Sequence, residues 1–355
     1  MPFRDVVGHR AVLTLLARAL ANDSLPPSLL LTGVDGVGKR RVAVAVAQAM
    51  NCGSSRRGAE PDGVSTPTRP RASDEPLAID ACGRCAPCRR IERGTYSDVL
   101  VVEPGENGTI TIDQVRTLVD QAGYRPFEGR RRVMIIDRAD QLGSPAQHAL
   151  LKTLEEPPPS SQFLLISARP DMLLDTVRSR CPQLRFGQLD VDAIVGLLTL
   201  QHRCDEAVAR PAAASAGGSV GRALSVASGE LAAARDAAMR LLDDVAAAPD
   251  PRTRLGSAKA LVAAARTRRT PAVERDELRR RLQALASLLR DMEVLGAGAD
   301  APLANADLRD GLTRLAASYG CGRGLRAFAA VDEAAEAVAR NASTKVVADW
   351  LACHL

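Results

Sequence analysis

The sequence predicts an α/β fold built on a parallel sheet, followed by an all-helical C-terminal half. Two short apolar runs rich in β-branched residues, 133–137 and 163–167, are predicted to be buried strands. Between them a helix is expected, with Ser144 as its N-cap, Gln147 closing a capping box and Pro157 ending it. Strand, helix and strand in this order are half of a parallel α/β sheet, and the alanine-rich C-terminal half favours packed helices.

Length and composition narrow the class of protein. With 355 residues the chain has room for two or three domains, and its formal net charge of +5 is mild. The N-terminus lacks an apolar signal region and the chain lacks an 18-residue apolar run, so we expect a cytoplasmic protein without a membrane partner. Eight cysteines, several of them clustered, then favour metal binding over disulfides.

A glycine-rich loop follows the predicted strand 29–32. Gly33, Gly36 and Gly38 allow backbone N–H groups to converge on phosphates, and Lys39 supplies a positive charge to them. The P-loop pattern next requires Ser or Thr, whose hydroxyl holds Mg²⁺, but this sequence has Arg40. We therefore expect ATP or ADP binding to be weak or absent and hydrolysis to be lost.

Four cysteines have the spacing of a metal site. Cys52 is followed by Cys82, Cys85 and Cys88, the last three at C-x-x-C intervals. Four thiolates suit tetrahedral Zn²⁺ and leave no open position, so the predicted zinc is structural. The alternative is a set of separately buried cysteines. The intervening segment 53–79 is rich in Gly, Ser, Arg, Pro and Thr and is predicted to be a disordered insertion.

Three blocks in order carry a family resemblance: the run 149–158 (Ala-Leu-Leu-Lys-Thr-Leu-Glu-Glu-Pro-Pro), the strand after it, and Ser179-Arg180-Cys181. Together they resemble the AAA+ subunits of bacterial DNA polymerase III clamp loaders. The resemblance implies a P-loop AAA+ domain over residues 1–186, with a zinc module at 52–88. It further implies a small helical lid at 187–229 and an all-α collar domain at 230–355, through which subunits form a ring.

The resemblance also implies where a degenerate nucleotide site lies. Val6 and Val7 match the adenine pocket, and Asp137 matches the strand-end acid. Ser167 matches the γ-phosphate sensor, and Arg222 matches the lid arginine. Motor subunits of the family have the lid arginine at the position of Gly221. Arg222 comes one residue later, about 100° further round a helix.

Two arginines separate this chain from an active motor. A motor has an acid directly after Asp137, whereas Arg138 stays protonated and cannot act as a general base, and Asp140 is expected to point elsewhere. Arg180 matches the arginine that family members project into a neighbour's ATP site, where it stabilises the transferring phosphoryl group. The alternative for Arg180 is a surface salt bridge. Cys181 is expected to be a small buried residue.

The resemblance therefore implies a subunit without ATPase activity of its own that supplies an arginine finger. Its implied partners are gamma/tau motor subunits and a delta subunit in a hetero-pentameric ring, a sliding clamp, and primer–template DNA reached through the complex. Two alternatives stay open. The chain is an active motor of the gamma/tau type, or it is a DNA-binding module built on the zinc cluster and the arginines at 130–132.

Overall fold

The computed structural model divides the chain into two compact units, one of residues 1–104 and 109–223 and one of residues 105–108 and 224–355. The structure describes residues 2–54, 77–105, 107–248, 250–258, 261, 271–299, 303–319, 322–340 and 342–355. Most of the predicted insertion, residues 55–76, lies outside the described residues. The three domain boundaries expected from the sequence stay a prediction.

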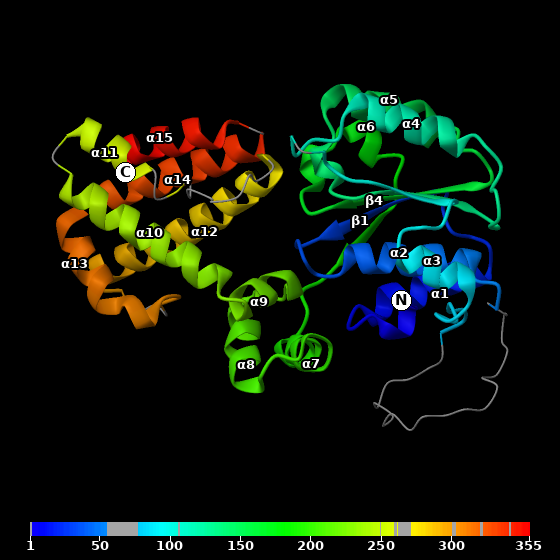
Figure 1. The fold of residues 1–355 in the computed structure, drawn as a ribbon, viewed down its shortest axis with the longest axis horizontal. Coiled ribbons are helices and arrows are strands. Elements are labelled where there is room, and N and C mark those ends of the chain that lie inside the picture. Colours follow the sequence, from blue (N-terminus) through cyan, green and yellow to red (C-terminus); the bar gives the residue numbers. More distant parts are fainter. Residues whose placement is uncertain are drawn as a thin grey trace. The chain divides into compact units, whose positions relative to one another are not determined.

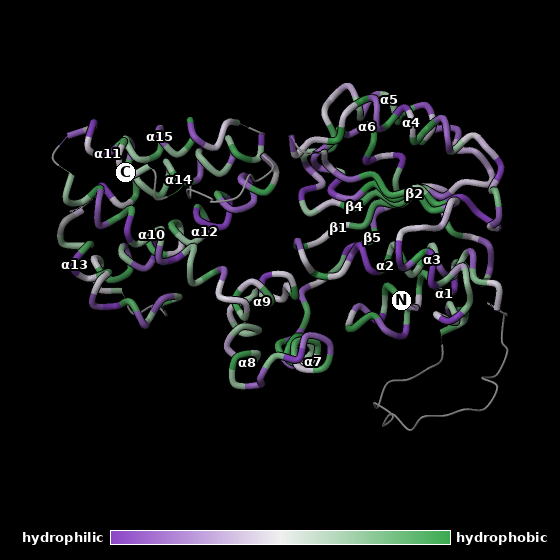
Figure 2. Tube along the Cα trace, viewed as in Figure 1, coloured by the Kyte–Doolittle hydropathy of each residue, from purple (hydrophilic) through white to green (hydrophobic). Residues whose placement is uncertain are grey.

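The first unit is built on a five-stranded sheet with the order β2-β3-β4-β1-β5. All neighbouring strands are parallel, and Leu30 of β1 lies opposite Leu165 of β4. The strands are β1 (Ser28–Gly33), β2 (Val99–Val102), β3 (Arg132–Ile136), β4 (Ser161–Ser167) and β5 (Gln183–Phe186). Because the central strands are buried on both faces, they read as continuous apolar runs, which appear green in Figure 2. The prediction of a parallel α/β sheet is confirmed.

Helices cover both faces of this sheet. In Figure 1, α4, α5 and α6 lie on one face and α1, α2 and α3 on the other. Their bounds are α1 (Arg10–Ala21), α2 (Lys39–Asn51), α3 (Ala86–Glu92), α4 (Ile112–Ala122), α5 (Ser144–Glu155) and α6 (Asp175–Arg178). Since all five strands run the same way, the segments that follow β1, β3 and β4 meet at one edge, where ligand sites of such sheets occur.

The predicted capping box of α5 is wrong. Gly143 is the N-cap, Ser144 is already helical, and no side chain caps the helix. Gln147 is buried and makes tertiary bonds instead: Nε2 donates to the Leu142 and Met172 carbonyls at 3.1 and 3.3 Å, and Oε1 accepts the Leu174 N–H at 2.7 Å. The box exists one helix earlier, at the start of α4, between Thr111 and Gln114.

The turn before β3 is fastened to the protein by a buried carboxylate. Asp98 is fully buried, accepts the backbone N–H groups of residues 127–129 at 2.7–2.9 Å and pairs with Arg132 at 3.2 Å. Arg131 donates to the Pro159 carbonyl and lies 3.4 Å from Asp23. Two of the three arginines at 130–132 therefore bind this chain itself.

The remaining helices follow the sheet in sequence. Helices α7 (Val191–His202) and α8 (Glu206–Ser215) belong to the first unit, and α9 (Val220–Ala227) crosses the boundary between residues 223 and 224. Those of the second unit are α10 (Glu230–Ala247), α11 (Pro251–Ser257), α12 (Pro271–Gly296), α13 (Arg309–Tyr319), α14 (Arg323–Ala339) and α15 (Thr344–His354).

The core of the second unit gathers around α12. The predicted apolar stripe of this helix is buried: Leu282, Leu285, Leu288, Leu289 and Met292. Leu241 and Leu242 of α10 and Val331 of α14 belong to the same cluster. Within the part of the chain that the structure describes, no helix combines the length and apolar character needed to span a membrane.

Candidate functional site

The glycine-rich loop lies between the end of β1 and the start of α2, at the ligand-binding edge of the sheet. Gly36 and Gly38 have φ values of 74° and 109°, a left-handed region that L side chains avoid. A side chain at Gly33 would in addition collide with the carbonyl of Phe186 at the end of β5. The glycines predicted from the pattern are thus demanded by the backbone of the loop.

Lys39 is folded into this loop. Its side chain is buried, and Nζ donates to the carbonyls of Gly33 at 2.7 Å and Val34 at 2.8 Å. Burial lowers the pKa of the Lys39 ammonium, while the nearby carboxylates of Asp35, Asp140 and Asp137 raise it. The lysine charge is therefore held among backbone carbonyls at the position where a P-loop receives phosphate.

Arg40 turns toward the next strand end. Its Nη1 lies 3.1 Å from Oδ2 of Asp137, the strand-end acid, and its Nη2 pairs with Glu103. Burial raises the pKa of the Asp137 carboxyl, and the charge of Arg40 opposes that rise. The acid that P-loop proteins use to hold Mg²⁺ is therefore already paired with a cation of the same chain.

Ser167 at the end of β4 also has a partner. Its hydroxyl donates to Oδ1 of Asp140 at 3.0 Å, and both side chains are largely buried. Asp140 further accepts the Ala168 N–H at 3.3 Å and pairs with Arg169 at 3.4 Å. Asp140 thus points to the end of β4, and the predicted γ-phosphate sensor is directed at a carboxylate.

The start of α9 and the residue before it lie directly on the glycine-rich loop. The hydroxyl of Ser219, which is fully buried, donates to the Asp35 carbonyl at 2.7 Å, and the Gly221 N–H donates to the Gly36 carbonyl at 3.2 Å. A Cβ at Gly221 would stand 3.1 Å from Gly36 Cα, closer than ordinary van der Waals contact. Arg222 is exposed, with its guanidinium next to Gly217.

The predicted adenine-pocket residues Val6 and Val7 are half-buried. The residue that sequence reasoning missed here is His9, whose Nε2 donates to the Val37 carbonyl at 3.0 Å. The His9 ring also packs edge-on against Phe186, with ring centroids 5.0 Å apart. The local sequence gives one signal for a backbone turn at His9, which is the preceding Gly8 with a φ of 74°. The contacts of His9 itself could not be predicted, because Val37 and Phe186 are distant in sequence.

The four predicted cysteine ligands come together. The sulfurs of Cys52, Cys82, Cys85 and Cys88 all lie within 4.8 Å of one another. The Sγ atoms of Cys52 and Cys85 are 3.9 Å apart. Tetrahedral zinc with Zn–S bonds of about 2.3 Å would separate its sulfurs by about 3.8 Å. The geometry fits a four-thiolate metal site, and Cys52 belongs to it despite its distance in sequence.

Backbone groups and the N-terminus support this cluster. Cys82 Sγ accepts the N–H groups of Arg84 and Cys85 at 3.4 and 3.3 Å. Burial raises the pKa of this thiol, but these hydrogen bonds lower it to about 6. Arg4 pairs with Asp80 at 3.0 Å and donates to the Ala81 and Cys82 carbonyls. The loop that carries three of the ligands is thus tied to the N-terminal segment.

Arg180 lies on the turn after α6. Its Nη1 donates to the Thr176 carbonyl at 2.9 Å and to Ser179 Oγ at 3.3 Å, and its Nη2 pairs with Glu155. About a third of the side chain is exposed (33%). The next residue, Cys181, is buried as predicted, and burial raises its pKa to about 12, so it is a poor nucleophile.

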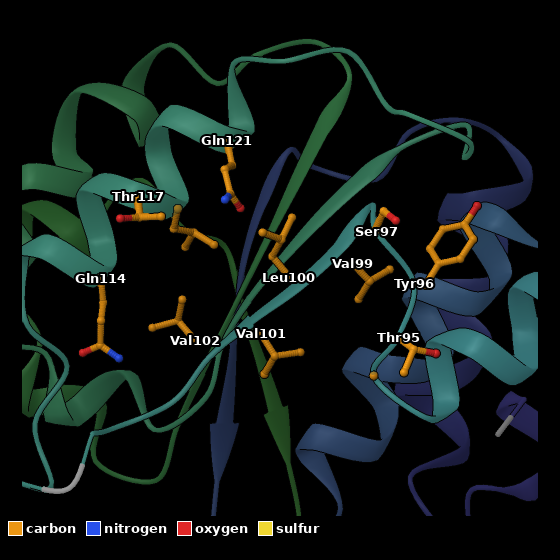
Figure 3. A pocket seen from close by; sticks show the side chains of 12 residues that line it. Thr95, Tyr96, Ser97, Val99, Leu100, Val101, Val102, Gln114, Thr117 and Gln121 are labelled. Atoms are coloured by element: carbon orange, nitrogen blue, oxygen red, sulfur yellow. The ribbon is translucent and has the colours of Figure 1, made fainter.

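A cavity of about 440 Å³ lies beside β2, at the edge of the sheet. Figure 3 shows its walls, formed by β2, the segment before it and α4, with Gln114, Thr117 and Gln121 on the helix side. None of the site residues predicted from the sequence lines this cavity.

The sheet is parallel, a P-loop follows β1, and polar groups stand at the ends of β3 and β4. The start of α9 reaches back to the loop. These features define a P-loop protein of the AAA+ class. A protein-family model described as "DNA polymerase III, delta subunit" matches residues 8–190, and the chain belongs to this family.

Curated relatives carry clamp-loader names. The chain is 34% identical over 192 residues to DNA polymerase III subunit tau of Escherichia coli K12. The matched segment covers 54% of this chain and 26% of that protein. It is 36% identical over 155 residues to DNA polymerase III subunit delta′ of Pseudomonas aeruginosa, covering 43% and 41% of the two chains. The matched segments thus span less than half the length of these relatives.

A solved structure of a DNA polymerase III gamma subunit-related protein from Thermotoga maritima superposes with a TM-score of 0.41. Its sequence is 17% identical, and the superposition covers 96% of this chain and 98% of that one.

Proposed function

We propose that this chain is the delta-prime subunit of a bacterial DNA polymerase III clamp loader, a stator that does not hydrolyse ATP. The observation that carries the proposal is the pairing of Arg40 with Asp137, because a permanently charged guanidinium stands at the acid that Mg²⁺ needs. The general base position after Asp137 holds Arg138, and Gly221 with Ser219 lies on the P-loop. These features favour delta-prime over the gamma/tau-type motor.

In this proposal Arg180 is the functional residue. The stator abuts a gamma/tau motor subunit and places the Arg180 guanidinium at the γ-phosphate of that neighbour. There it offsets the negative charge that develops on the transferring phosphoryl group. The other proposed partners are the delta subunit in a hetero-pentameric ring, the sliding clamp, and primer–template DNA reached through the complex in the cytoplasm.

Zinc is proposed as the ion of the four-cysteine site, with a structural role. The thiolates of Cys52, Cys82, Cys85 and Cys88 would hold it, and no ligand position would be left for chemistry. The proposed binding of ATP or ADP at the P-loop is weak or absent, since Lys39 and Arg40 both have partners in the chain.

The test of the finger is ATP hydrolysis by the reconstituted loader with clamp and primed DNA. Arg180→Ala is expected to lower the rate severalfold or more, whereas the matched control Arg178→Ala leaves it unchanged, since Arg178 pairs with Asp175 of its own helix. Light scattering verifies that the ring assembles. An unchanged rate with an intact ring contradicts the proposal.

A further inference from the structure

The Arg180 guanidinium has three acceptors, all in its own chain. Two belong to its own turn, the Thr176 carbonyl and the Ser179 hydroxyl. The third, Glu155, is the last residue of α5 and lies 25 residues earlier in the sequence. Glu155 is therefore the only charged group bonded to Arg180 among the described contacts, and it holds the guanidinium from a different element.

Glu155 stands on a rigid support. It is the last residue of α5, and only Glu156 separates it from a run of three prolines at 157–159, where φ is fixed. Its side chain is about half exposed (48%), so the pair lies at the surface, where a second subunit can reach it. A surface ion pair of this kind is weak and exchangeable, whereas a phosphate offers more negative charge and bidentate geometry to a guanidinium.

We propose that Glu155 is a positioning residue that holds Arg180 against its own chain until a polyphosphate bound to a neighbouring subunit displaces it. The inference rests on the proposed function, because it concerns the same arginine. Glu155 keeps the long Arg180 side chain in one orientation and competes with phosphate for its charge. The arginine then transfers only to a ligand more highly charged than a single carboxylate.

The first test needs only the isolated full-length chain. An arginine-selective dicarbonyl reagent is applied, and modification of Arg180 is followed by peptide mass spectrometry. Glu155→Gln is expected to speed modification of Arg180 by about two- to fivefold, the range of a surface ion pair. The matched control Asp175→Asn removes the partner of Arg178 in the same turn and should speed modification of Arg178 alone. Equal Arg180 rates in wild type and Glu155→Gln overturn the proposal.

The second test uses the reconstituted loader. Glu155→Gln is expected to lower the ATP concentration that gives half-maximal hydrolysis by about two- to fivefold, with little change in the maximal rate. The effect should vanish when Arg180→Ala is also present. A shift that persists without Arg180, or no shift at all, overturns the role of Glu155. If Arg180→Ala by itself changes nothing, the proposed function falls, and the positioning role falls with it.

Discussion

Arg40 is an example of one side chain that changes the chemistry of a whole site. Its guanidinium stays protonated at any accessible pH, so Asp137 faces a permanent cation. A hydroxyl in its place would instead help to hold a divalent ion that comes and goes with the nucleotide. Arg40 thus puts a permanent positive charge between α2 and the end of β3, at the place where a P-loop ATPase holds its divalent ion.

Asp98 is the residue whose loss is expected to harm the fold most directly. Asp98→Ala leaves Arg132 and three N–H groups without their buried acceptor, and should lower the free energy of unfolding by about 3–5 kcal/mol at pH 7. The control Asp113→Ala removes an exposed carboxylate and should cost less than about 1 kcal/mol. Denaturant titration measures both values.

The same carboxylate predicts a pH dependence. Burial raises the pKa of Asp98, but the backbone N–H groups of residues 127–129 and the charge of Arg132 outweigh it and hold the pKa below its usual range. A depressed pKa gives stability that is present above the unfolded-state value and lost as the pH falls. The difference between wild type and Asp98→Ala should therefore shrink below about pH 4, and a constant difference would contradict this assignment.

For single residues, the sequence shows where a side chain departs from a local motif. It does not show which groups that side chain contacts in the folded protein. Arg40 and Arg138 stand out because the P-loop and the strand end have short, fixed spacing. The partners cannot be predicted in this way. Asp137 lies 97 residues from Arg40, and Asp140 lies 27 residues from Ser167. His9 is missed for the same reason, since the Val37 carbonyl and Phe186 reach it only in the folded sheet.

Among the elements, the cysteine cluster joins the end of α2 to the start of α3. Metal analysis of the purified protein should give about one zinc per chain. Cys85→Ser should lose the metal and lower the melting temperature, because the apolar cluster described at this site consists of Ala81 and the four cysteines themselves. Cys204→Ser is the control, since Cys204 lies outside the cluster. Zinc-free wild-type protein would contradict the assignment.

Elements are predicted well where one local signal dominates. The strand runs and the helix after the P-loop are confirmed because apolar pattern and loop chemistry agree. The start of α5 is wrong because Ser144 and Gln147 have the spacing of a capping box, whereas Gln147 is drawn into bonds with the segment 172–174. Tertiary hydrogen bonds that cross elements override a cap that the local sequence favours.

For the whole molecule, the decisive measurement is ATP turnover by the isolated, zinc-loaded protein. The rate should equal that of Lys39→Ala, in which the P-loop lysine is lost, because the proposed stator lacks the Mg²⁺ hydroxyl at position 40, the catalytic acid at 138 and the lid arginine at 221. Turnover above that of Lys39→Ala would instead support an active motor of the gamma/tau type.

For the whole molecule, the order of the parts along the chain was predictable, from β1 and its loop to the helical second unit. The reason is that the separate motifs appear one after another in the sequence. What holds the second unit together was predictable only for the stripe of α12, since the other helices are rich in alanine and give weak periodic signals. The membership of the family rests on residues 8–190, and residues 224–355 of the second unit lie outside that match.

The contact between Gly36 and Gly221 bears on how such a chain evolves. An arginine at position 221 must place its Cβ against Gly36, and a side chain at Gly36 meets Ser219 and Gly221 in turn. A Cβ at Gly221 requires its neighbour to move by a few tenths of an ångström, whereas a side chain at Gly36, whose φ is 74°, must displace the hydrogen-bonded segment 219–221. Substitutions at Gly36 and Gly221 are therefore expected to be coupled in their effects, so that a change at either glycine limits which residues the other position tolerates.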